Sequence, residues 1–426
     1  MTMTSATHDH KGRPIVAVTG LGVVTSLGQG KDDNWAALTS GRSGLKTITR
    51  FPTEGLRTTV AGTIDFLQID DFCAPALTEK LAVLAGEEAL AQSGLSDTDF
   101  PGPLFIAVPP VELEWEHRLA LYEAGQTEDG WKRMLEGVRN GDWVGMHRAF
   151  SFAGVEERVA DRFGTRGAPI SLTTACASGA TSIQLGVEAI RRGDCDAALC
   201  LAADGSVHPE TVVRFSLLSA LTGQNEPPEK ASKPFAKNRD GFVVAEGGGA
   251  FVLESLESAR ARGAEVLAIV SGIGERADDF HRTRSKPDGS SIIGVFREAL
   301  KDADMSIEDI DYVNAHGTAT PENDKMEYLA LEAVFGEALP SIPVSSNKSM
   351  IGHTITAAGA VEAVFSVLSL KTGRLPPTIN YEEADPTIPL DVIPNAARDV
   401  PIRTVMSNSF GFGGQNVSLL LSAEPF

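Results

Sequence analysis

Basic residues are scarce in this sequence. Its 426 residues include 37 Lys and Arg against 57 Asp and Glu, which gives a formal net charge of −20 at pH 7. Nucleic acids and anionic membrane surfaces attract basic proteins, so this charge argues against both as partners. An acidic partner protein is compatible with it only if that partner docks on a local basic patch. We therefore expect an acidic, soluble protein that binds no nucleic acid.

Cysteine is also rare. The chain has four cysteines, none in a CxxC pair and none with a His at the spacing of a zinc site: Cys73, Cys176, Cys195 and Cys200. Scattered cysteines of this kind are typical of reduced thiols. We therefore predict a cytoplasmic protein without a structural zinc ion.

Long apolar runs are lacking. No run approaches the roughly 20 residues that a helix needs to span a bilayer, so no membrane insertion is expected. The opening residues, MTMTSATHDHKGRP, have no apolar core of the kind found in signal peptides, and we interpret them as a loose polar leader. A hydrophobic content of 42% and 42 glycines fit a compact α/β protein.

Nucleotide and metal motifs are missing as well. GLGVVTSLG follows an apolar stretch, but Thr25 stands where a dinucleotide-binding turn needs its third glycine. No GxxxxGK[ST] sequence occurs. EWEH, at 114–117, has metal-capable side chains but no second cluster, so a solvated helix face is the favoured interpretation. The sequence thus predicts no metal and no resident cofactor.

The chain does contain an internal repeat. IVAVTGLG (15–22) matches LAIVSGIG (267–274), and EEALAQSGLSDTDF (87–100) matches REALKDADMSIEDI (297–310). Each copy alternates apolar strands with helices. This alternation predicts largely parallel sheets in layered α/β packing.

A third matching pair holds the most informative residues. PISLTTACASGATSIQLGVEAI (169–190) aligns without a gap with PVSSNKSMIGHTITAAGAVEAV (343–364). The helices expected after Cys176 and His353 are apolar almost all round, so they should be buried between layers.

The repeat divides the chain into two halves. We place the boundary in ESLESARARGAE, which gives an N-terminal half of residues 1–260 and a C-terminal half of residues 261–426. Residues 110–165 and 205–240 have no counterpart in the second half. We expect them to be insertions, the first helical and the second rich in loops.

Cys176 stands where a strand meets a buried helix. The free N–H groups and partial positive charge of a helix N-terminus favour a thiolate. Free cysteines are also common as core filling, and this stretch alone leaves both interpretations open. Two histidines favour the first, because His316 and His353 also lie between a strand and a helix. If the halves pack about a pseudo-twofold axis, one Cys and two His meet at one site.

Three motifs resemble a known family. TACASGA (174–180), NAHGTATPENDKME (314–327) and NKSMIGHTITAAGAVEA (347–363) occur in this order, with NSFGFGGQN near the end. They resemble the elongating β-ketoacyl-[acyl-carrier-protein] synthases, and the resemblance covers nearly the whole chain. It implies a thiolase-like duplicated fold, layered α-β-α-β-α with two mixed, mostly parallel sheets. It also implies a homodimer whose partner is acyl-carrier protein in acyl and malonyl forms; phosphopantetheine would arrive on that carrier.

The resemblance also implies a reaction and its residues. Cys176 would take an acyl chain as a thioester, and malonyl-carrier protein would lose carbon dioxide and extend that chain by two carbons in fatty acid biosynthesis. His316 and His353 would donate hydrogen bonds to the negative charge that decarboxylation creates. The other implied residues are Lys348 with the supporting carboxylates Asp324, Glu327 and Glu362, Phe410 as gate and oxyanion N–H donor, and Thr318, Thr320, Gly411 and Phe412 for substrate binding.

Two departures concern the pocket and the docking surface. After the strand PLFIAV the family usually has a glycine-rich turn, whereas this chain has PPVELEWEHR. Residues 66–80 are acidic and apolar where relatives often carry basic residues for docking the carrier. Other cations would then serve, such as Arg214, Lys230, Lys233 or Arg282.

Several alternatives remain. A thiolase would need a second catalytic Cys, and none follows Cys200; a starter-unit synthase would have Asn in place of His353. A non-catalytic chain-length partner would lack the nucleophile Cys176. A ketosynthase of a polyketide or specialised long-chain or signalling lipid pathway would keep every residue named above, and sequence alone does not separate it from fatty-acid elongation.

Overall fold

The computed structural model describes residues 6–70 and 72–425. Its first half contains, in chain order, β1 (Val16–Thr25), β2 (Gly28–Gln29), α1 (Lys31–Thr39), β3 (Lys46–Thr47), β4 (Val60–Ala61), α2 (Ala74–Ser93), β5 (Leu104–Ala107), α3 (Trp115–Glu123), α4 (Gly130–Asn140), α5 (Val144–Ala149), α6 (Gly154–Phe163), β6 (Ile170–Leu172), α7 (Ser178–Arg191), β7 (Ala197–Asp204), α8 (Pro209–Leu217), β8 (Gly247–Ser255) and α9 (Leu256–Ala261).

The second half repeats the opening pattern of strand, helix and strand. Its elements are β9 (Ala268–Ala277), α10 (Ser290–Ala303), β10 (Tyr312–Asn314), α11 (Pro321–Phe335), β11 (Pro343–Ser345), α12 (Lys348–Ile351), the 3-10 turn η4 (Ile355–Ala357), α13 (Ala358–Thr372), β12 (Arg374–Leu375), β13 (Asp391–Val392), β14 (Arg398–Asp399), β15 (Thr404–Phe410) and β16 (Gln415–Ser422). Strands β1 and β9 fall on the first repeated stretch, and α2 and α10 end on the second, as predicted.

The main strands form one hydrogen-bonded path. The order is β13-β11-β10-β15-β16-β9-β1-β8-β7-β5-β6, with β2 paired to β1. The halves join where β1 and β9 pair over only three residues, from Val16↔Val270 to Val18↔Ala268. Each half has parallel strands toward its edge, while β8, β9 and β16 pair antiparallel with their neighbours. Two mixed, mostly parallel sheets were expected; the strands are mixed as expected, but the pairing of β1 with β9 joins them in one path, and its central pairs are antiparallel.

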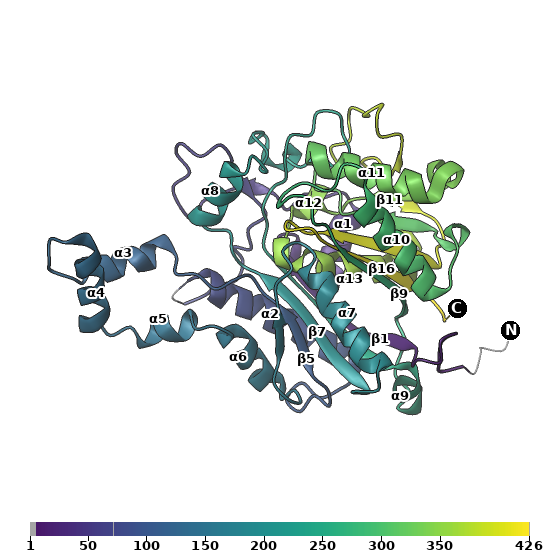
Figure 1. Cartoon of the computed structure of the whole chain (residues 1–426), viewed down its shortest axis with the longest axis horizontal. Coiled ribbons are helices and arrows are strands. Elements are labelled where there is room, and N and C mark those ends of the chain that lie inside the picture. The colour runs from purple at the N-terminus through teal and green to yellow at the C-terminus, as the bar shows by residue number, and fades with distance from the viewer. Residues whose placement is uncertain (1–5, 71, 426) are drawn as a thin grey trace.

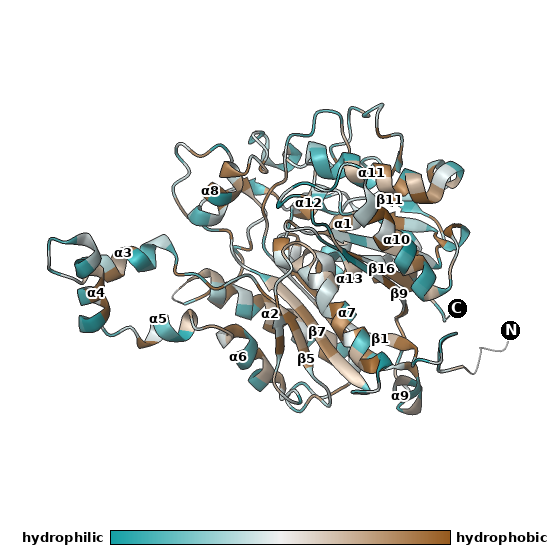
Figure 2. Cartoon of the chain, viewed as in Figure 1, coloured by the Kyte–Doolittle hydropathy of each residue, from teal (hydrophilic) through white to brown (hydrophobic). Residues whose placement is uncertain are grey.

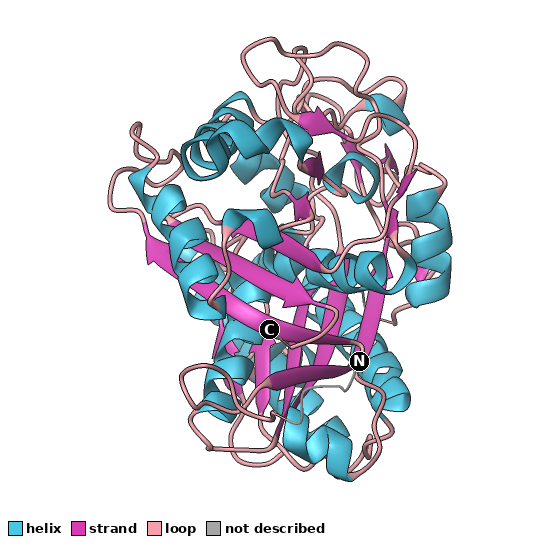
Figure 3. Ribbon diagram, turned by 90° about the vertical axis from the view of Figure 1, so that its right-hand side faces the viewer, coloured by secondary structure: helices cyan, strands magenta, loops and turns pink. Residues whose placement is uncertain are grey.

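Helices lie on both sides of each half of the sheet (Figures 1 and 3). Helix α2 packs on β1, β7 and β8, whereas α10 packs on β9 and β16, and α7 and α13 contact each other in the middle. Three hydrophobic clusters match these layers. The largest is central and includes Ile183, Val187, Val361 and Val364; the other two lie under α2 and under α10.

Small residues let α7 and α13 approach closely. A Cβ on Gly179 would lie 2.4 Å from the backbone N of Ala360, and one on Gly359 would lie 2.5 Å from that of Ala180. These reciprocal contacts relate the two helices by a pseudo-twofold axis. The second half inserts α12 and η4 between its strand and its helix. The gap-free sequence alignment of these segments is therefore wrong in the helical part.

The first predicted insertion forms an arm. Helices α3, α4 and α5 project from the body (Figure 1), and their ribbon includes hydrophobic, brown segments (Figure 2). The most exposed large apolar side chains in the arm are Trp131, Val144 and Phe152, at 69%, 74% and 89%. The second insertion contains α8 and otherwise consists mainly of loops. Both insertions have the predicted character.

The structure also bears on the expected polar leader and on the expected lack of long apolar runs. The first five residues of the expected polar leader lie outside the described residues, but the part that follows is tied down, since Lys11 and Arg13 both form ion pairs with Asp302 at 2.9 Å. Residues Ile355–Thr372 are apolar and long enough to span a membrane, yet 78% of this stretch is buried in the protein. It is the core helix of the central layer.

Candidate active site

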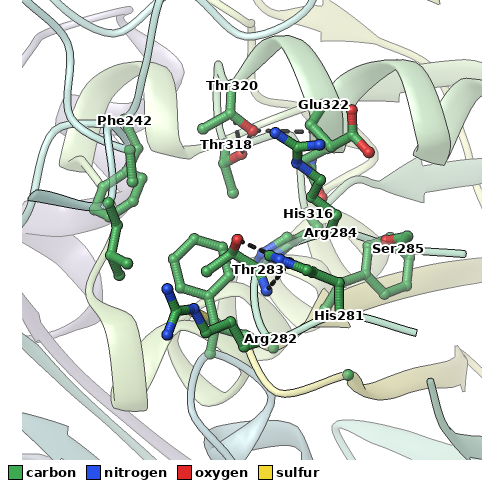
Figure 4. A pocket seen from close by; sticks show the side chains of 18 of the residues that line it. Phe242, His281, Arg282, Thr283, Arg284, Ser285, His316, Thr318, Thr320 and Glu322 are labelled. Carbon is green, nitrogen blue, oxygen red and sulfur yellow. Dashed lines mark hydrogen bonds between the residues drawn. The ribbon is translucent and has the colours of Figure 1, made fainter. Parts of the chain in front are cut away.

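The predicted catalytic residues meet in one cavity. Cys176 lies between β6 and α7, His316 follows β10, and His353 lies between α12 and η4. Together with Phe410, at the end of β15, they line a cavity of about 530 Å³. Figure 4 shows this cavity with His316, Phe242 and the loop of residues 281–285 around it.

The sulfur and the two imidazoles are close together. Their Sγ and ring nitrogen atoms lie within 4.8 Å of one another, and the two rings are 5.3 Å apart, edge to face. Cys176 is 6% exposed and both histidines are 2% exposed. The structure thus brings together one nucleophile and two hydrogen-bonding groups, all of them buried.

Both histidines are neutral. Burial, together with the positive charge of Lys348, holds the pKa of His316 and that of His353 well below the usual value. The Lys348 ammonium lies 3.3 Å from Nδ1 of His316, and the Ile355 N–H donates to Nδ1 of His353 at 3.3 Å. With Nδ1 occupied as an acceptor, each ring carries its proton on Nε2. Nε2 of His353 is buried and has no partner among the described residues, so it can donate to a substrate.

The protonation state of Cys176 differs from the expected thiolate. Burial raises its pKa to about 11, although the Phe412 N–H next to the sulfur and the charge of Lys348 act in the opposite direction. The site without substrate therefore holds a thiol at neutral pH, because loss of solvation outweighs the start of α7. The proton must leave the sulfur for the attack to occur, so acyl transfer depends on the loss of this proton.

Lys348 is fully buried. Its ammonium forms an ion pair with Glu362 and donates to the carbonyl of His316 at 2.7 Å. Burial raises the pKa of Glu362 to about 7, with Lys348 opposing this shift. A buried cation beside two imidazoles lowers their pKa values, and the supporting role of Lys348 in catalysis stays a prediction.

The other two predicted carboxylates do not contact Lys348. Glu327 accepts hydrogen bonds from the N–H groups of His316 and Gly317, at 2.9 and 2.8 Å, and burial raises its pKa to about 7. Asp324 accepts from the Phe235 N–H at 2.7 Å. The expectation that both belong to the Lys348 charge network is wrong. Glu327 instead fixes the turn that presents His316.

The turn after β15 approaches the nucleophile. The Phe410 ring packs 5.5 Å from the ring of His316, which suits a gate, but the backbone N–H next to Cys176 Sγ belongs to Phe412. The oxyanion role of the Phe410 N–H stays a prediction. Gly411 allows this approach, because a Cβ there would lie 2.7 Å from the carbonyl oxygen of Thr174.

Thr318 and Thr320 face the same cavity. Their hydroxyl groups are 2.9 Å apart, and both residues line the cavity wall. Thr320 also caps α11, since its hydroxyl accepts from the Asn323 N–H at 3.2 Å. The structural and the substrate-binding interpretations of Thr320 are thus compatible.

Sequence reasoning missed Phe242. Its ring packs edge to face against His353, with centroids 5.2 Å apart, and it lines the cavity. It lies in GFVVAEGGGA, which has only the apolar pattern of a core segment. Within this stretch, Glu246 is structural as predicted: it pairs with Arg50 and accepts from the Ile64 N–H at 2.7 Å.

A second cavity lies beside the Cys176 loop. It has a volume of about 320 Å³ and is lined by Thr173, Ala175 and the segment 108–112. The proline-rich start of PPVELEWEHR therefore forms its wall. Asp204, which accepts from the Thr356 N–H at 3.1 Å, also lines it.

Two groups of the described residues have metal-ligand geometry. One is Cys176 with His316 and His353; the other is Glu114 with Glu116 and His117. Glu114 is buried and accepts from the Ala74 N–H at 2.6 Å, so the expectation of a solvated helix face is wrong for it. This bond places Glu114 at the start of α2.

Of the four cations considered for docking, three have partners. Arg214 pairs with Glu112, Lys230 pairs with Glu382, and Lys233 donates to the side chain of Gln224. Arg282 has no ion-pair partner among the residues that the structure describes, and it lines the catalytic cavity. The structure thus sets Arg282 apart from the others.

A duplicated α/β fold with a cysteine and two neutral histidines at its centre defines a condensing enzyme of the thiolase fold. The chain belongs to the β-ketoacyl synthase family: the N-terminal domain of that family matches residues 14–259 and the C-terminal domain matches residues 267–382. It is therefore an acyl-transferring condensing enzyme, and the predicted family and fold class are confirmed.

Similar proteins include polyketide ketoacyl synthases and 3-oxoacyl-[acyl-carrier-protein] synthases. The tetracenomycin polyketide synthase ketoacyl synthase alpha subunit of Streptomyces glaucescens is 36% identical, with 96% of each chain covered. The 3-oxoacyl-[acyl-carrier-protein] synthase 2 of Coxiella burnetii is also 36% identical, over 96% of this chain and 98% of the other. Among solved structures, the type II polyketide ketosynthase AntDE, in complex with its acyl-carrier protein AntF, has a TM-score of 0.83 at 31% identity, covering 96% of this chain and 100% of that chain.

Proposed function

We propose that this chain is a 3-oxoacyl-[acyl-carrier-protein] synthase that extends an acyl chain by two carbons through decarboxylative condensation with malonyl-carrier protein. The observation that carries the proposal is the pair of neutral imidazoles beside Cys176, of which His353 has a buried Nε2 without a partner among the described residues. Two such donors suit an enolate oxygen, whereas a hydrolase or a simple acyltransferase needs no second histidine of this kind.

The first step is acyl transfer. The Cys176 thiol gives up its proton and its sulfur attacks the thioester carbon of the acyl-carrier protein. The tetrahedral oxyanion is stabilised by backbone N–H groups, and the N–H of Phe412 next to the sulfur is a candidate. Collapse expels the carrier thiolate, which takes up a proton. The acyl group is then bound to Cys176 as a thioester.

The second step is decarboxylation and carbon–carbon bond formation. The bond between C2 and the carboxylate of the malonyl group breaks, carbon dioxide leaves, and the electron pair is delocalised onto the thioester oxygen as an enolate. The Nε2 protons of His316 and His353 stabilise that oxygen. C2 then attacks the acyl carbonyl on Cys176, and the sulfur leaves with the other electron pair. No resident cofactor takes part, because the phosphopantetheine comes with the substrate.

We infer that the acyl chain occupies the cavity of about 320 Å³ next to Ala175. Its wall includes the atypical segment that begins PPVELEWEHR. The alternative function, a ketosynthase of a polyketide or specialised lipid pathway, is supported by a relative from a polyketide synthase whose identity to this chain, 36%, equals that of a 3-oxoacyl-[acyl-carrier-protein] synthase 2. The acyl substrate that the enzyme prefers separates the two.

We also infer that the enzyme is a homodimer. The edge strand β6 exposes Ile170, at 46%, and the arm exposes large apolar side chains. An uncovered sheet edge and an apolar surface of this kind favour association with a second copy.

Intact-mass spectrometry tests the proposed reaction. The enzyme is mixed with a series of acyl-carrier proteins, alone and with malonyl-carrier protein, and Cys176→Ser serves as the matched control. We expect an acyl adduct on the wild type only, and a product longer by two carbons. A preference for saturated chains supports fatty-acid elongation, and a preference for polyketone chains supports the alternative. The absence of both adduct and product, with carriers from the same genome included, would contradict the proposed function.

A further inference from the structure

The arm begins with a group of metal-capable side chains outside the catalytic cavity. Glu114, Glu116 and His117 each present one ligand atom, and these three atoms lie within 4.8 Å of one another. Glu114 is the N-cap residue of α3, the first helix of the arm (Figure 1). None of the three residues lines the catalytic cavity. The sequence EWEH alone does not distinguish such a group from a solvated helix face, so only the folded chain shows it.

Glu114 is a buried carboxylate without a cationic partner. It is 6% exposed and forms no ion pair among the described residues. One of its oxygens accepts from the Ala74 N–H at 2.6 Å, and the other has no hydrogen-bond partner in the described part of the chain. Burying a carboxylate costs free energy unless a positive charge or several donors compensate it. A metal ion at the free oxygen would supply that charge.

His117 independently points to a ligand at the same place. Its Nδ1 is buried and has no hydrogen-bond partner among the residues that the structure describes. The ring packs edge to face against Phe150, with centroids 4.7 Å apart, which restricts its rotation. A buried ring nitrogen without a partner has lost its hydrogen bond to water and gained none in return. Coordination of a metal ion would satisfy this nitrogen, because neutral imidazole is the commonest metal ligand among side chains.

The surroundings of the three residues favour a cation. Glu114 and Glu116 line a cavity of about 390 Å³, and Glu210 adds a third carboxylate to its wall. Among the described residues of this wall, the one Lys or Arg is Arg50, which already forms ion pairs with two other carboxylates. Carboxylates that face a space without a free basic side chain attract a positive ion.

The turn that carries the ligands is fixed to the body of the protein. Glu114 accepts from the start of α2, and the Trp115 N–H donates to Glu210 of α8. The other Glu210 oxygen lies 2.9 Å from Nδ1 of His208. Such supporting contacts hold metal ligands in place. Glu116, in contrast, is exposed and forms no hydrogen bond in the described chain, so it can move inward to the spacing of about 3.4 Å between ligand atoms around a tetrahedral ion.

We propose that Glu114, Glu116 and His117 bind one Zn²⁺ ion, with water at the remaining position. Two carboxylate oxygens and one imidazole nitrogen suit Zn²⁺, whereas Mg²⁺ and Ca²⁺ prefer oxygen ligands alone. All three ligands belong to the N-cap and first turn of α3, so the ion stabilises the start of the arm and takes no part in the condensation. The proposal is therefore independent of the proposed function.

Equilibrium dialysis of the metal-free, full-length protein against Zn²⁺ gives the first test. We expect His117→Ala and Glu116→Gln each to weaken binding by at least about tenfold, since even the loss of a group that only supports a ligand has an effect of this size. Neither residue is fully buried, so both variants should fold, which thermal unfolding checks. The matched controls His147→Ala and Glu123→Gln change the same residue types at exposed positions of the arm and should keep the wild-type affinity.

The second test separates this site from the catalytic cluster, because Cys176, His316 and His353 also have metal-ligand geometry. Co²⁺ is the probe, since a thiolate ligand gives it an intense sulfur-to-metal charge-transfer absorption that oxygen and nitrogen ligands do not give. In Cys176→Ala we expect Co²⁺ to show weak d–d bands without that absorption. In Cys176→Ala/His117→Ala we expect these bands to be lost.

Four results would overturn the proposal. A wild-type protein that retains no Zn²⁺ has no such site. Binding that His117→Ala leaves unchanged places the ion elsewhere, and binding that is lost in Cys176→Ala places it in the catalytic cavity. Displacement of Zn²⁺ by an equal concentration of Mg²⁺ would mean that carboxylates alone hold the cation, without the imidazole.

Discussion

At the scale of single residues, the site depends on which proton each side chain holds. Cys176 is a thiol because burial raises its pKa, and the histidines are neutral because burial and Lys348 lower theirs. Lys348 therefore affects both half-reactions. Its charge favours the thiolate that acyl transfer needs, and it keeps the imidazoles neutral as the N–H donors that decarboxylation needs. One buried cation links the nucleophile to the groups that stabilise the enolate.

Substitution of His353 should separate the two half-reactions. His353→Ala removes an N–H donor from the enolate oxygen, and we expect malonyl decarboxylation to fall about 100-fold or more. Acyl transfer should fall much less, whereas Cys176→Ser should abolish it with the fold intact. Radiolabelled carbon dioxide release and acyl-enzyme formation measure the two steps, and thermal unfolding checks the fold. Equal losses in both steps for His353→Ala would contradict this division.

The two half-reactions should also differ in pH dependence. Because burial places the Cys176 pKa at about 11, the thiolate fraction grows as pH rises, so the acyl-transfer rate should increase about tenfold per pH unit below that value. The imidazole pKa values are lowered, so decarboxylation should stay constant from about pH 8 down to about pH 6. Stopped-flow acylation and decarboxylation by Cys176→Ala provide the profiles. A decarboxylation rate that halves near the ordinary histidine pKa would show that the imidazoles are not held neutral.

At the scale of helices and strands, the crossing of α7 and α13 sets the distance between the halves. Cys176 precedes one helix and His353 precedes the other, so the gap between these helices fixes the gap between nucleophile and donor. Gly179 and Gly359 allow the backbones to touch at this point. Catalytic geometry therefore depends on two residues without side chains.

A methyl group at this crossing should be costly. In Gly359→Ala the new Cβ would lie 2.5 Å from the Ala180 N, and we expect the free energy of unfolding to fall by about 2 kcal/mol, with activity reduced as well. Gly145→Ala is a matched control, because a Cβ there meets nothing within 4 Å. Denaturant unfolding of both variants measures the difference. Similar stabilities would mean that the helices can move apart without penalty.

The sequence predicted the positions of some of these elements correctly and those of others wrongly. The repeat located β1, β9, α2 and α10 because the apolar strands and their small-residue turns recur in both copies. It misplaced the register of α13 relative to α7, because α12 and η4 interrupt the second copy and the small residues around them align equally well in two ways. The single path of strands was also missed, since the pairing of β1 with β9 depends on tertiary packing.

The site was predictable to the extent that motifs marked it. Cys176, His316 and His353 occur in distinctive motifs and do meet in one cavity, and Lys348 is buried next to His316. The contacts of Asp324 and Glu327 were not predictable, because two carboxylates on one helix turn face different neighbours. Phe242 and the loop of Arg282 lie far along the chain from the motifs, and only folding brings them to the cavity.

At the scale of the whole molecule, the exposed apolar surface should govern assembly. If β6 and the arm are covered by a second copy, Ile170→Asp places a charge in that interface and should shift the protein to monomers. Analytical ultracentrifugation measures the change. Leu217→Asp, a substitution of another exposed apolar residue at 81%, tests whether any new surface charge has this effect. A wild-type protein that sediments as a monomer would contradict the proposed dimer.

The short pairing of β1 with β9 has a consequence for protein dissection. Among the described residues, three residue pairs of the sheet join the halves, yet the central cluster draws side chains from both, so neither half can bury its own inner helix. A chain cut at the exposed Gly263 should give two fragments that are insoluble apart and reassemble when refolded together. The first fragment holds the nucleophile and the second holds both histidines. Activity recovered on mixing would therefore report fragment complementation directly.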